Sequence, residues 1–279
     1  MSTENALLTI LVEKINNDTL VLPTLPAIAL KVREAADDPD ANLNMMADVI
    51  GQDPALSARM IKIANSAYLG RTVKVESLQQ AVTRIGLRQI KNISTALAME
   101  QLFVSKNEIV KDFLNKLWDR TVDVTANAMA AYKLYSRSPK ANKKINSDAL
   151  TLSVLVHNIG VLPILSEAER HEDVFANPTF LNVAIQKLAG RLGGTIMREW
   201  GFSDEMVQIT ENWRSLKVQT DAVSYMDFVR LGAVLSGSIS SYKDTILNIC
   251  QKKGILEDVN ILHSEEFKAL VLDAKAIFK

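Results

Sequence analysis

Two adjacent residues, His157 and Asn158, are one substitution away from a metal-binding pair. A histidine followed by an aspartate would supply an imidazole nitrogen and an anionic oxygen, which are common ligands of divalent metal ions. Asn158 offers only a neutral carbonyl oxygen, whereas hard divalent cations favour charged oxygen ligands. The pair therefore predicts a site with little affinity for a metal ion, unless other residues restore the missing negative charge.

A second group of candidate metal ligands follows this pair, and it consists of Glu167, Glu169, His171, Glu172 and Asp173. Carboxylates and an imidazole can bind a metal ion, but the spacing of these residues matches no usual metal site. A solvated, charged loop accounts for the same composition. We therefore predict an exposed loop in this segment.

Three closely spaced glycines, Gly190, Gly193 and Gly194, raise the question of a phosphate-binding loop. No Gly-Lys-Ser or Gly-Lys-Thr sequence follows them, so the pattern of such a loop is not matched. We expect these glycines instead to allow close packing of helices, or to start a helix that leads to Trp200.

Helices must position these residues, because the chain shows helical punctuation and no convincing alternating strands. Asp53 precedes a proline and can cap the helix that begins there, and Ser77-Leu78-Gln79-Gln80 fits a capping box. Apolar periodicity predicts further helices over residues 108–135 and from Ser147 or Asp148 to about Leu165. The sequence thus predicts an all-α fold, with His157 inside a helix.

Composition limits the classes of function. The 279 residues include 32 basic and 32 acidic side chains, which argues against a protein that binds nucleic acid by neutralising phosphates. Cys250 is the sole cysteine, so neither an intrachain disulfide nor a thiolate zinc site can form. Residues 1–11 lack the pattern of a signal peptide, and no stretch approaches the roughly 20 apolar residues of a membrane span. We expect a soluble cytoplasmic protein whose partners include neither nucleic acid nor a membrane.

Four motifs resemble the HDOD family, which comprises bacterial domains related to HD-type metal phosphohydrolases and usually found in signalling proteins. In chain order they are Leu22-Pro23-Thr24-Leu25-Pro26, Gln52-Asp53-Pro54-Ala55-Leu56-Ser57-Ala58-Arg59, Ala64-Asn65-Ser66-Ala67 and Ala81-Val82-Thr83-Arg84-Ile85-Gly86-Leu87. The resemblance extends from about Leu20 to about Trp213. It implies a multi-helix HD-like fold.

The same resemblance implies a division of the chain. An HDOD domain would occupy residues 20–215, with an N-terminal helical lobe over about 20–105 packed on a degenerate HD lobe over about 106–215. Residues 1–19 would form an N-terminal helix or extension. Residues 216–279 would add C-terminal helices that complete the fold.

In the catalytic HD relatives, a histidine, a His-Asp pair and a distant aspartate hold the metal, and some relatives add further histidines. The resemblance places these positions, which we call the HD-equivalent positions, at Arg120, His157, Asn158, Ala189, Trp213, Arg214 and Ala233. Only His157 keeps the ligand type, and Arg120 would add a positive charge. One imidazole cannot hold a catalytic metal, which needs several protein ligands. The resemblance therefore implies no metal, no catalytic residue and no cofactor.

The favoured function is that of a non-catalytic signalling module that acts by association with another signalling protein. Neither the identity of that partner nor the oligomeric state follows from the sequence. A metal-dependent phosphohydrolase or cyclic-dinucleotide phosphodiesterase is the least favoured alternative, because an enzyme should keep charged ligands at Asn158 and Ala233.

An intermediate alternative is a sensor of nucleotides or small anions. Its pocket would be lined by Arg120, His157, Asn158, Trp213 and Arg214, with arginine to bind phosphate and tryptophan to stack on a base. The purely structural interpretation is that each arginine pairs with an acid such as Asp119 or Glu211. His157 and Asn158 would then be hydrogen-bonded core groups, as buried polar side chains require.

Overall fold

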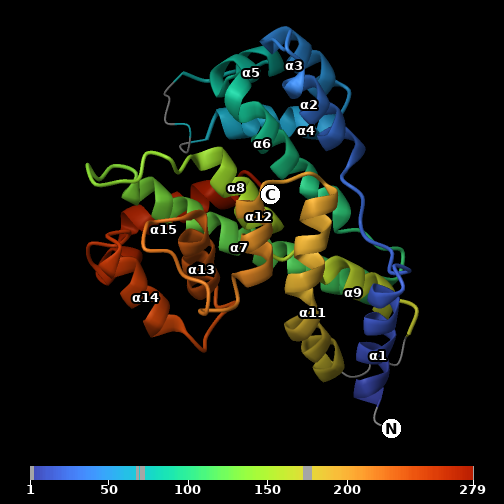
Figure 1. Cartoon of the computed structure of the whole chain (residues 1–279). Coiled ribbons are helices and arrows are strands. Elements are labelled where there is room, and N and C mark those ends of the chain that lie inside the picture. The colour runs from blue at the N-terminus through green and yellow to red at the C-terminus, as the bar shows by residue number, and fades with distance from the viewer. Residues whose placement is uncertain (1–2, 67–68, 70–72, 172–177, 279) are drawn as a thin grey trace. The chain divides into compact units, whose positions relative to one another are not determined.

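A computed structural model of the chain describes residues 3–66, 69, 73–171 and 178–278 (Figure 1). Within these residues the regular elements are helices and no strand occurs, which confirms the predicted all-α fold. The α-helices are α1 (Thr3–Asn16), α2 (Ala27–Asp37), α3 (Leu43–Gly51), α4 (Pro54–Ala64), α5 (Leu78–Ile85), α6 (Leu87–Ala98), α7 (Glu108–Tyr135), α8 (Ser147–Val156), α9 (Val161–Ala168), α11 (Pro178–Glu199), α12 (Asp204–Asn212), α13 (Tyr225–Leu235), α14 (Lys243–Lys252) and α15 (Glu265–Lys275). The 3-10 helices η2 (Met99–Leu102) and η3 (Val259–His263) also lie among the described residues.

The chain divides into two compact units. The first unit comprises Met1–Leu25, Gln101–Trp118 and Val156–Lys217, and the second comprises Pro26–Glu100, Asp119–Leu155 and Val218–Lys279. Each unit is thus assembled from segments that lie far apart in the sequence. The two lobes expected from the resemblance are continuous stretches of sequence, unlike these units. The boundaries of the lobes stay a prediction.

The starts of α4 and α5 use the capping residues that the sequence predicts. The side chain of Asp53 accepts a hydrogen bond from the N–H of Leu56 at 3.0 Å and so caps α4. At α5, the hydroxyl of Ser77 accepts from the N–H of Gln80 at 3.2 Å. The side chain of Gln80 accepts in turn from the N–H of Glu76 at 2.9 Å. The capping box at α5 therefore forms with its returning bond one residue earlier than predicted.

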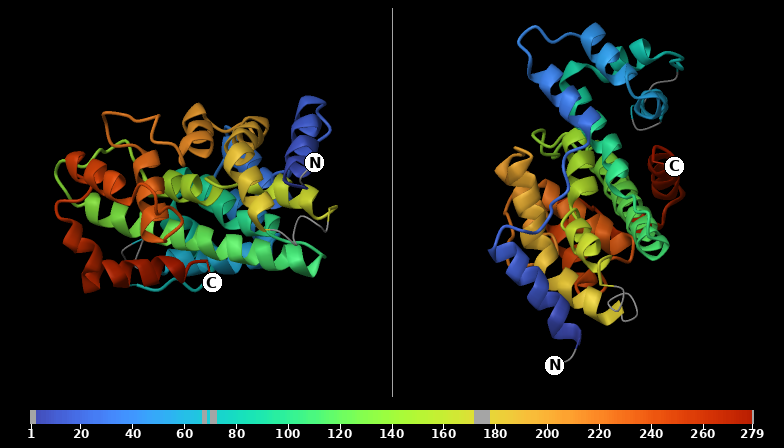
Figure 2. Two further views of the ribbon diagram at one scale, coloured as in Figure 1. Left: turned by 90° about the horizontal axis from the view of Figure 1, so that it is seen from below. Right: turned by 90° about the vertical axis from the view of Figure 1, so that its right-hand side faces the viewer.

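The first unit is built around α11, which packs against α1, α9 and α12 (Figure 2). Glycines make the contact with α12 close. A Cβ at Gly190 would lie 2.7 Å from the carbonyl oxygen of Glu211, one at Gly193 would lie 3.3 Å from Thr210, and one at Gly194 would overlap the Glu211 side chain. Close helix packing is therefore confirmed as the role of these glycines.

The apolar segment after residue 147 forms two helices, so the prediction of one continuous helix to about Leu165 is wrong. Turns over residues 157–160 separate α8 from α9. The N–H of Ile159 bonds to the carbonyl of Val156, three residues back instead of four, at 3.0 Å. Pro163 gives the physical reason, because in a continuous helix it would lack one hydrogen bond and its ring would clash with the preceding turn.

The segment Ser147–Ala168 also corrects the expectation about membrane spans. By length and composition alone it could cross a membrane, and it is the one such segment in the part of the chain that the structure describes. However, 89% of its apolar window is buried inside the protein. A helix that lies in a protein core passes the same test of length and composition, and this degree of burial is typical of such a helix.

The second unit contains α2–α6 and the C-terminal helices. Asn65, from one of the HDOD-like motifs, donates to the carbonyl of Val75 and accepts from its N–H, both at 2.8 Å, and so holds Val75 beside the end of α4. The expected C-terminal helices are present as α13, α14 and α15. Asp227 of α13 and Lys253, just after α14, form a largely buried ion pair at 2.8 Å, which ties these two packed helices together.

Candidate functional site

His157 lies in the turns between α8 and α9, within the first unit. His157 is 3% exposed. Its ring contacts the ring of Trp213 edge-on, with the ring centroids 4.6 Å apart and an angle of 76° between the planes. This T-shaped contact is a favoured arrangement of two aromatic rings. The predicted burial of His157 is therefore confirmed, although its predicted place inside a helix is wrong.

Arg214 connects this turn to the end of α12. Its Nη2 donates a hydrogen bond to Oδ1 of Asn158 at 2.5 Å. Its guanidinium carbon lies 4.1 Å from the centre of the Trp213 ring, which is a cation–π distance. We call His157, Asn158, Trp213 and Arg214 the Arg214 cluster. The fold thus brings together four of the five residues that the sequence suggested for a ligand pocket.

The guanidinium of Arg214 has no acidic partner in the described part of the chain. Glu211, which the sequence suggested as a partner, pairs with Arg198 instead. Burial lowers the pKa of Arg214 to about 10, so the group stays protonated at neutral pH. A guanidinium carries five N–H donors, and beyond the bond to Asn158 those of Arg214 have no acceptor among the described residues.

This arrangement disfavours a metal ion within the Arg214 cluster. His157 and Asn158 supply no negative charge, and the oxygen of Asn158 already accepts a bond from a cation. A second positive charge placed beside Arg214 would be repelled by it. Among all residues that the structure describes, no group of three or more His, Cys, Asp and Glu side chains could hold a metal ion.

The remaining HD-equivalent positions carry no ligand chemistry. Ala189 of α11 and Ala233 of α13 are buried aliphatic residues. Arg120 is exposed on α7 in the second unit, to which Ala233 also belongs. The proposed place of Arg120 in a pocket with the Arg214 cluster therefore stays a prediction.

Gly160 determines how closely the turn of His157 and Asn158 approaches α11. Its backbone angles, φ −67° and ψ −4°, suit any residue, so conformational freedom does not explain the glycine. A Cβ at this position would overlap the carbonyl oxygen of Ala189 and the amide nitrogen of Gly193, both on the backbone of α11. The absence of a side chain at Gly160 therefore lets the turn lie directly on α11.

Glu167 corrects the prediction of an exposed acidic loop. It belongs to the last turn of α9 and is 4% exposed, and its carboxylate lies 2.7 Å from the ammonium of Lys14 in α1. Arg170 and His171 also approach this carboxylate, at 3.4 and 3.5 Å. Burial alone would raise the pKa of Glu167, but the hydrogen bond and charge of Lys14, with a further effect of Arg170, lower it overall.

The other members of that acidic group do not form a metal site with Glu167. Glu169 accepts a hydrogen bond from the hydroxyl of Ser105 at 2.9 Å. Glu172 and Asp173 lie outside the described residues. Sequence reasoning missed Glu167 because its main partner, Lys14, is remote in the chain and reaches it only after folding.

Cys250 leads to a prediction about reactivity. This residue of α14 is 1% exposed, and burial together with nearby Asp227 raises the pKa of its thiol to about 12. Because the thiolate is the reactive form, we expect native protein at pH 8 to resist alkylation by iodoacetamide. Mass spectrometry should find Cys250 labelled only after denaturation, and rapid labelling of the folded protein would contradict its burial.

A profile of the HDOD domain matches residues 22–215. Together with the helical fold and the family motifs, this match shows that the chain belongs to the HDOD domain family. The match agrees with the extent expected from the resemblance, about Leu20 to Trp213.

Among solved structures, a protein of Shewanella amazonensis SB2B that is named as a proposed metal-dependent phosphohydrolase is 40% identical, with a TM-score of 0.93 and full coverage of both chains. A proposed signal transduction protein of Marinobacter aquaeolei VT8 is 19% identical, with a TM-score of 0.57, over 99% of this chain and 64% of that one. The latter likeness establishes the fold alone. An uncharacterized protein of Treponema pallidum (strain Nichols) is 29% identical over 97 residues, which are 35% of this chain, and the chain spans 19% of that protein's length.

Proposed function

We propose that the chain is a non-catalytic signal-transduction module that acts by associating with another protein. The observation that carries this proposal is the hydrogen bond from Arg214 to Asn158. It places a protonated guanidinium beside His157 and Asn158, the pair at which an HD enzyme would bind its metal. Both ligand loss and charge repulsion oppose metal binding at this place. The chain belongs to the HDOD family, which is related to HD phosphohydrolases. The signalling role is our proposal and goes beyond this family assignment.

Metal analysis tests the non-catalytic part of the proposal. Purified, untagged protein is incubated with manganese, iron or zinc and desalted, and its metal content is measured. We expect a content well below one equivalent per chain, because a catalytic site needs several charged or imidazole ligands. Retention of one equivalent or more would overturn the proposal. It would favour the metal-dependent phosphohydrolase suggested by the name of the Shewanella relative, and phosphodiesterase assays would follow.

Association is tested by affinity capture from lysate under several crosslinking conditions. We expect one or a few signalling proteins to be recovered reproducibly, and their absence under all conditions would count against the proposal. The proposed location is cytoplasmic, as the sequence suggests. An assay of cell fractions with an antibody to the chain tests that location, and recovery in the membrane fraction would contradict it.

A sensor of nucleotides or small anions is a second candidate, which the state of Arg214 favours. Its guanidinium is a largely buried charge that lacks an acidic partner in the described part of the chain, and its other N–H donors have no acceptor there. Arginine binds phosphate through paired N–H donors, and the indole of Trp213 lies beside it. An anion at Arg214 would therefore supply the missing charge.

Titration with inorganic phosphate and with ATP tests this candidate. If Arg214 holds the anion, Arg214→Ala should weaken binding by about ten-fold or more, as expected for loss of a charge-assisted contact. Arg120→Ala should weaken it as well only if Arg120 shares the pocket. Equal binding by Arg214→Ala and the unmodified protein would eliminate the sensor.

A further inference from the structure

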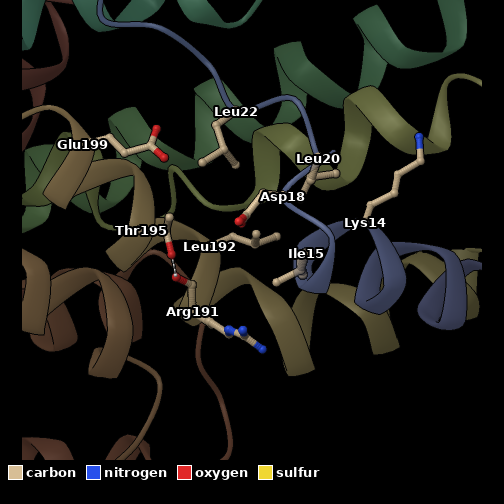
Figure 3. Close-up of a pocket in the computed structure, with 9 residues that line it drawn as sticks. All are labelled: Lys14, Ile15, Asp18, Leu20, Leu22, Arg191, Leu192, Thr195 and Glu199. Atoms are coloured by element: carbon tan, nitrogen blue, oxygen red, sulfur yellow. Dashed lines mark hydrogen bonds between the residues drawn. The ribbon is translucent and has the colours of Figure 1, made fainter.

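A pocket of about 550 Å³ lies between α1 and α11 in the first unit (Figure 3). Its walls are the last turn of α1, the segment that follows this helix, and one face of α11. The volume is in the range of pockets that bind small molecules. None of its lining residues belongs to the Arg214 cluster, so it is a separate candidate site.

Four contacts hold the walls of this pocket in place. Lys14 at the end of α1 pairs with the buried Glu167 of α9. The N–H groups of Thr19 and Leu20 both bond to the carbonyl of Lys14, at 2.9 and 3.2 Å, and so fold the chain back over the end of α1. Farther along, the indole N–H of Trp200 donates to the carbonyl of Pro23 at 3.1 Å, within the first unit. Bonds within the protein therefore hold the walls in place, and rigid walls reduce the cost of ordering on binding.

Asp18 occupies a conformation that favours glycine. Its φ of +53° makes it the one non-glycine residue with positive φ among the described residues. Left-handed residues of this kind commonly end helices, and glycine adopts the conformation with less strain than aspartate. Figure 3 shows the Asp18 side chain directed toward the α11 wall, and it has no hydrogen bond or ion pair within the described part of the chain. A carboxylate thus stands in the pocket where the backbone alone would favour glycine.

Two further charged residues lie at opposite ends of the α11 wall. Arg191 and Glu199 are eight residues apart, which corresponds to about 12 Å along a helix axis. Both are exposed, and neither side chain has a partner among the described residues. Between them Leu192 is almost fully buried, so the accessible apolar surface of the pocket comes from the half-buried Leu20 and Leu22 on the facing wall. The lining therefore has Arg191 and Glu199 at opposite ends of the α11 wall and Asp18 between them, as Figure 3 shows, while its second cation, Lys14, is paired with Glu167.

We propose that this pocket binds a short peptide of about three residues with free termini, since an extended chain rises about 3.3 Å per residue and so matches the separation of the Arg191 and Glu199 positions along α11. The peptide's ammonium group lies at the carboxylates of Asp18 and Glu199, and its carboxylate lies at Arg191. An aliphatic side chain of the peptide packs on Leu20 and Leu22. Charge-assisted hydrogen bonds at both termini then select the length of the ligand.

Calorimetric titration of the full chain with the tripeptide Ala-Leu-Ala tests the ligand class. The matched probes are the same peptide with an acetylated N-terminus and with an amidated C-terminus, each of which removes one charge. We expect the free tripeptide to bind and each blocked form to bind at least about ten-fold more weakly. The proposal is overturned if the free tripeptide shows no binding up to about 10 mM, or if either blocked form binds as tightly. Tighter binding of free leucine or of spermidine would also overturn it.

Variants of the pocket separate binding from folding. Asp18→Asn tolerates the left-handed backbone but removes the charge, and Asp18→Gly should leave thermal stability equal or higher. Both changes, and Arg191→Gln, should weaken tripeptide binding about ten-fold. The controls are Glu13→Gln on α1 and Lys187→Gln on α11, which remove exposed charges outside the pocket. Unchanged binding by Asp18→Asn and Arg191→Gln, or an equal loss in the controls, would overturn the proposal.

Discussion

Gly160→Ala should destabilise the protein by about 3 kcal/mol or more, at the upper end of the usual cost of overpacking. The added methyl group would overlap the carbonyl oxygen of Ala189 and the amide nitrogen of Gly193. Both are backbone atoms of α11, so neither can turn aside as a flexible side chain would. The turn that carries His157 and Asn158 would have to move away from α11. Urea unfolding, followed by circular dichroism, measures the loss.

Gly51→Ala is the matched control for this prediction. Gly51 ends α3 and is exposed, and a Cβ there would meet only Leu78, at an ordinary contact distance of 3.7 Å. Because alanine is favoured over glycine in helices, this change should be neutral or stabilising by up to about 1 kcal/mol. Comparable losses in the two variants would show that close packing at Gly160 does not decide the outcome.

Glu167→Gln should lower the free energy of unfolding by about 2 kcal/mol at pH 7. This loss is smaller than the loss on breaking a fully buried ion pair, because the Lys14 side chain is partly exposed. The folded state lowers the pKa of Glu167, so the carboxylate contributes stability above the pKa of the unfolded chain. That contribution is lost as the pH falls through the lowered pKa of the folded state. The difference between the two proteins should therefore shrink below about pH 4.5 and approach zero in stronger acid.

Urea unfolding of both proteins across this pH range measures the difference. Asp112→Asn provides a control, since Asp112 pairs with Lys116 at 2.6 Å on the exposed face of α7. An exposed pair of this kind contributes less than about 1 kcal/mol, so the control should show a small loss with little dependence on pH. A Glu167→Gln difference that stayed constant from pH 7 into the acid range would contradict the role of its charge.

The two variants also probe different parts of the first unit. Gly160 positions the turn of the Arg214 cluster on α11, whereas Glu167 holds the end of α1 and one wall of the pocket beside it. We expect Glu167→Gln to affect tripeptide binding, because Lys14 would be released from its place in the wall. Phosphate binding at Arg214, if present, should be unaffected by that change.

Local chemistry made several features predictable. The cap at Asp53 needs only the residues next to it, and the periodicity of residues 108–135 is visible without any partner. The break after Val156 was also predictable in principle, because Pro163 cannot donate the hydrogen bond that a continuous helix requires. The periodicity of the apolar residues around it favoured one helix and led to the wrong prediction.

The partners of charged side chains were less predictable, because they depend on distant segments. Glu211 lies three residues before Arg214 in the sequence, yet it pairs with Arg198, and Arg214 bonds to Asn158. Similarly, the composition around Glu167 is that of a solvated loop, and only the folded chain brings Lys14 to it. Neither Glu211 nor Arg214 pairs with the other, although they are close in sequence, and the shortest ion pair of Glu167 joins it to the remote Lys14 and not to its neighbour Arg170.

The sequence by itself determined the all-α class and the HDOD family, since both depend on residue types and their order. The loss of charged metal ligands at the HD-equivalent positions stays a prediction from the resemblance. Only the tertiary structure decided that Arg214 stands against Asn158 without an acidic partner among the described residues, and that a pocket lies between α1 and α11. The physical reason is that charge pairing and cavity shape depend on distances between segments far apart in the chain. Those distances are fixed by close contacts such as that of Gly160 with the backbone of α11.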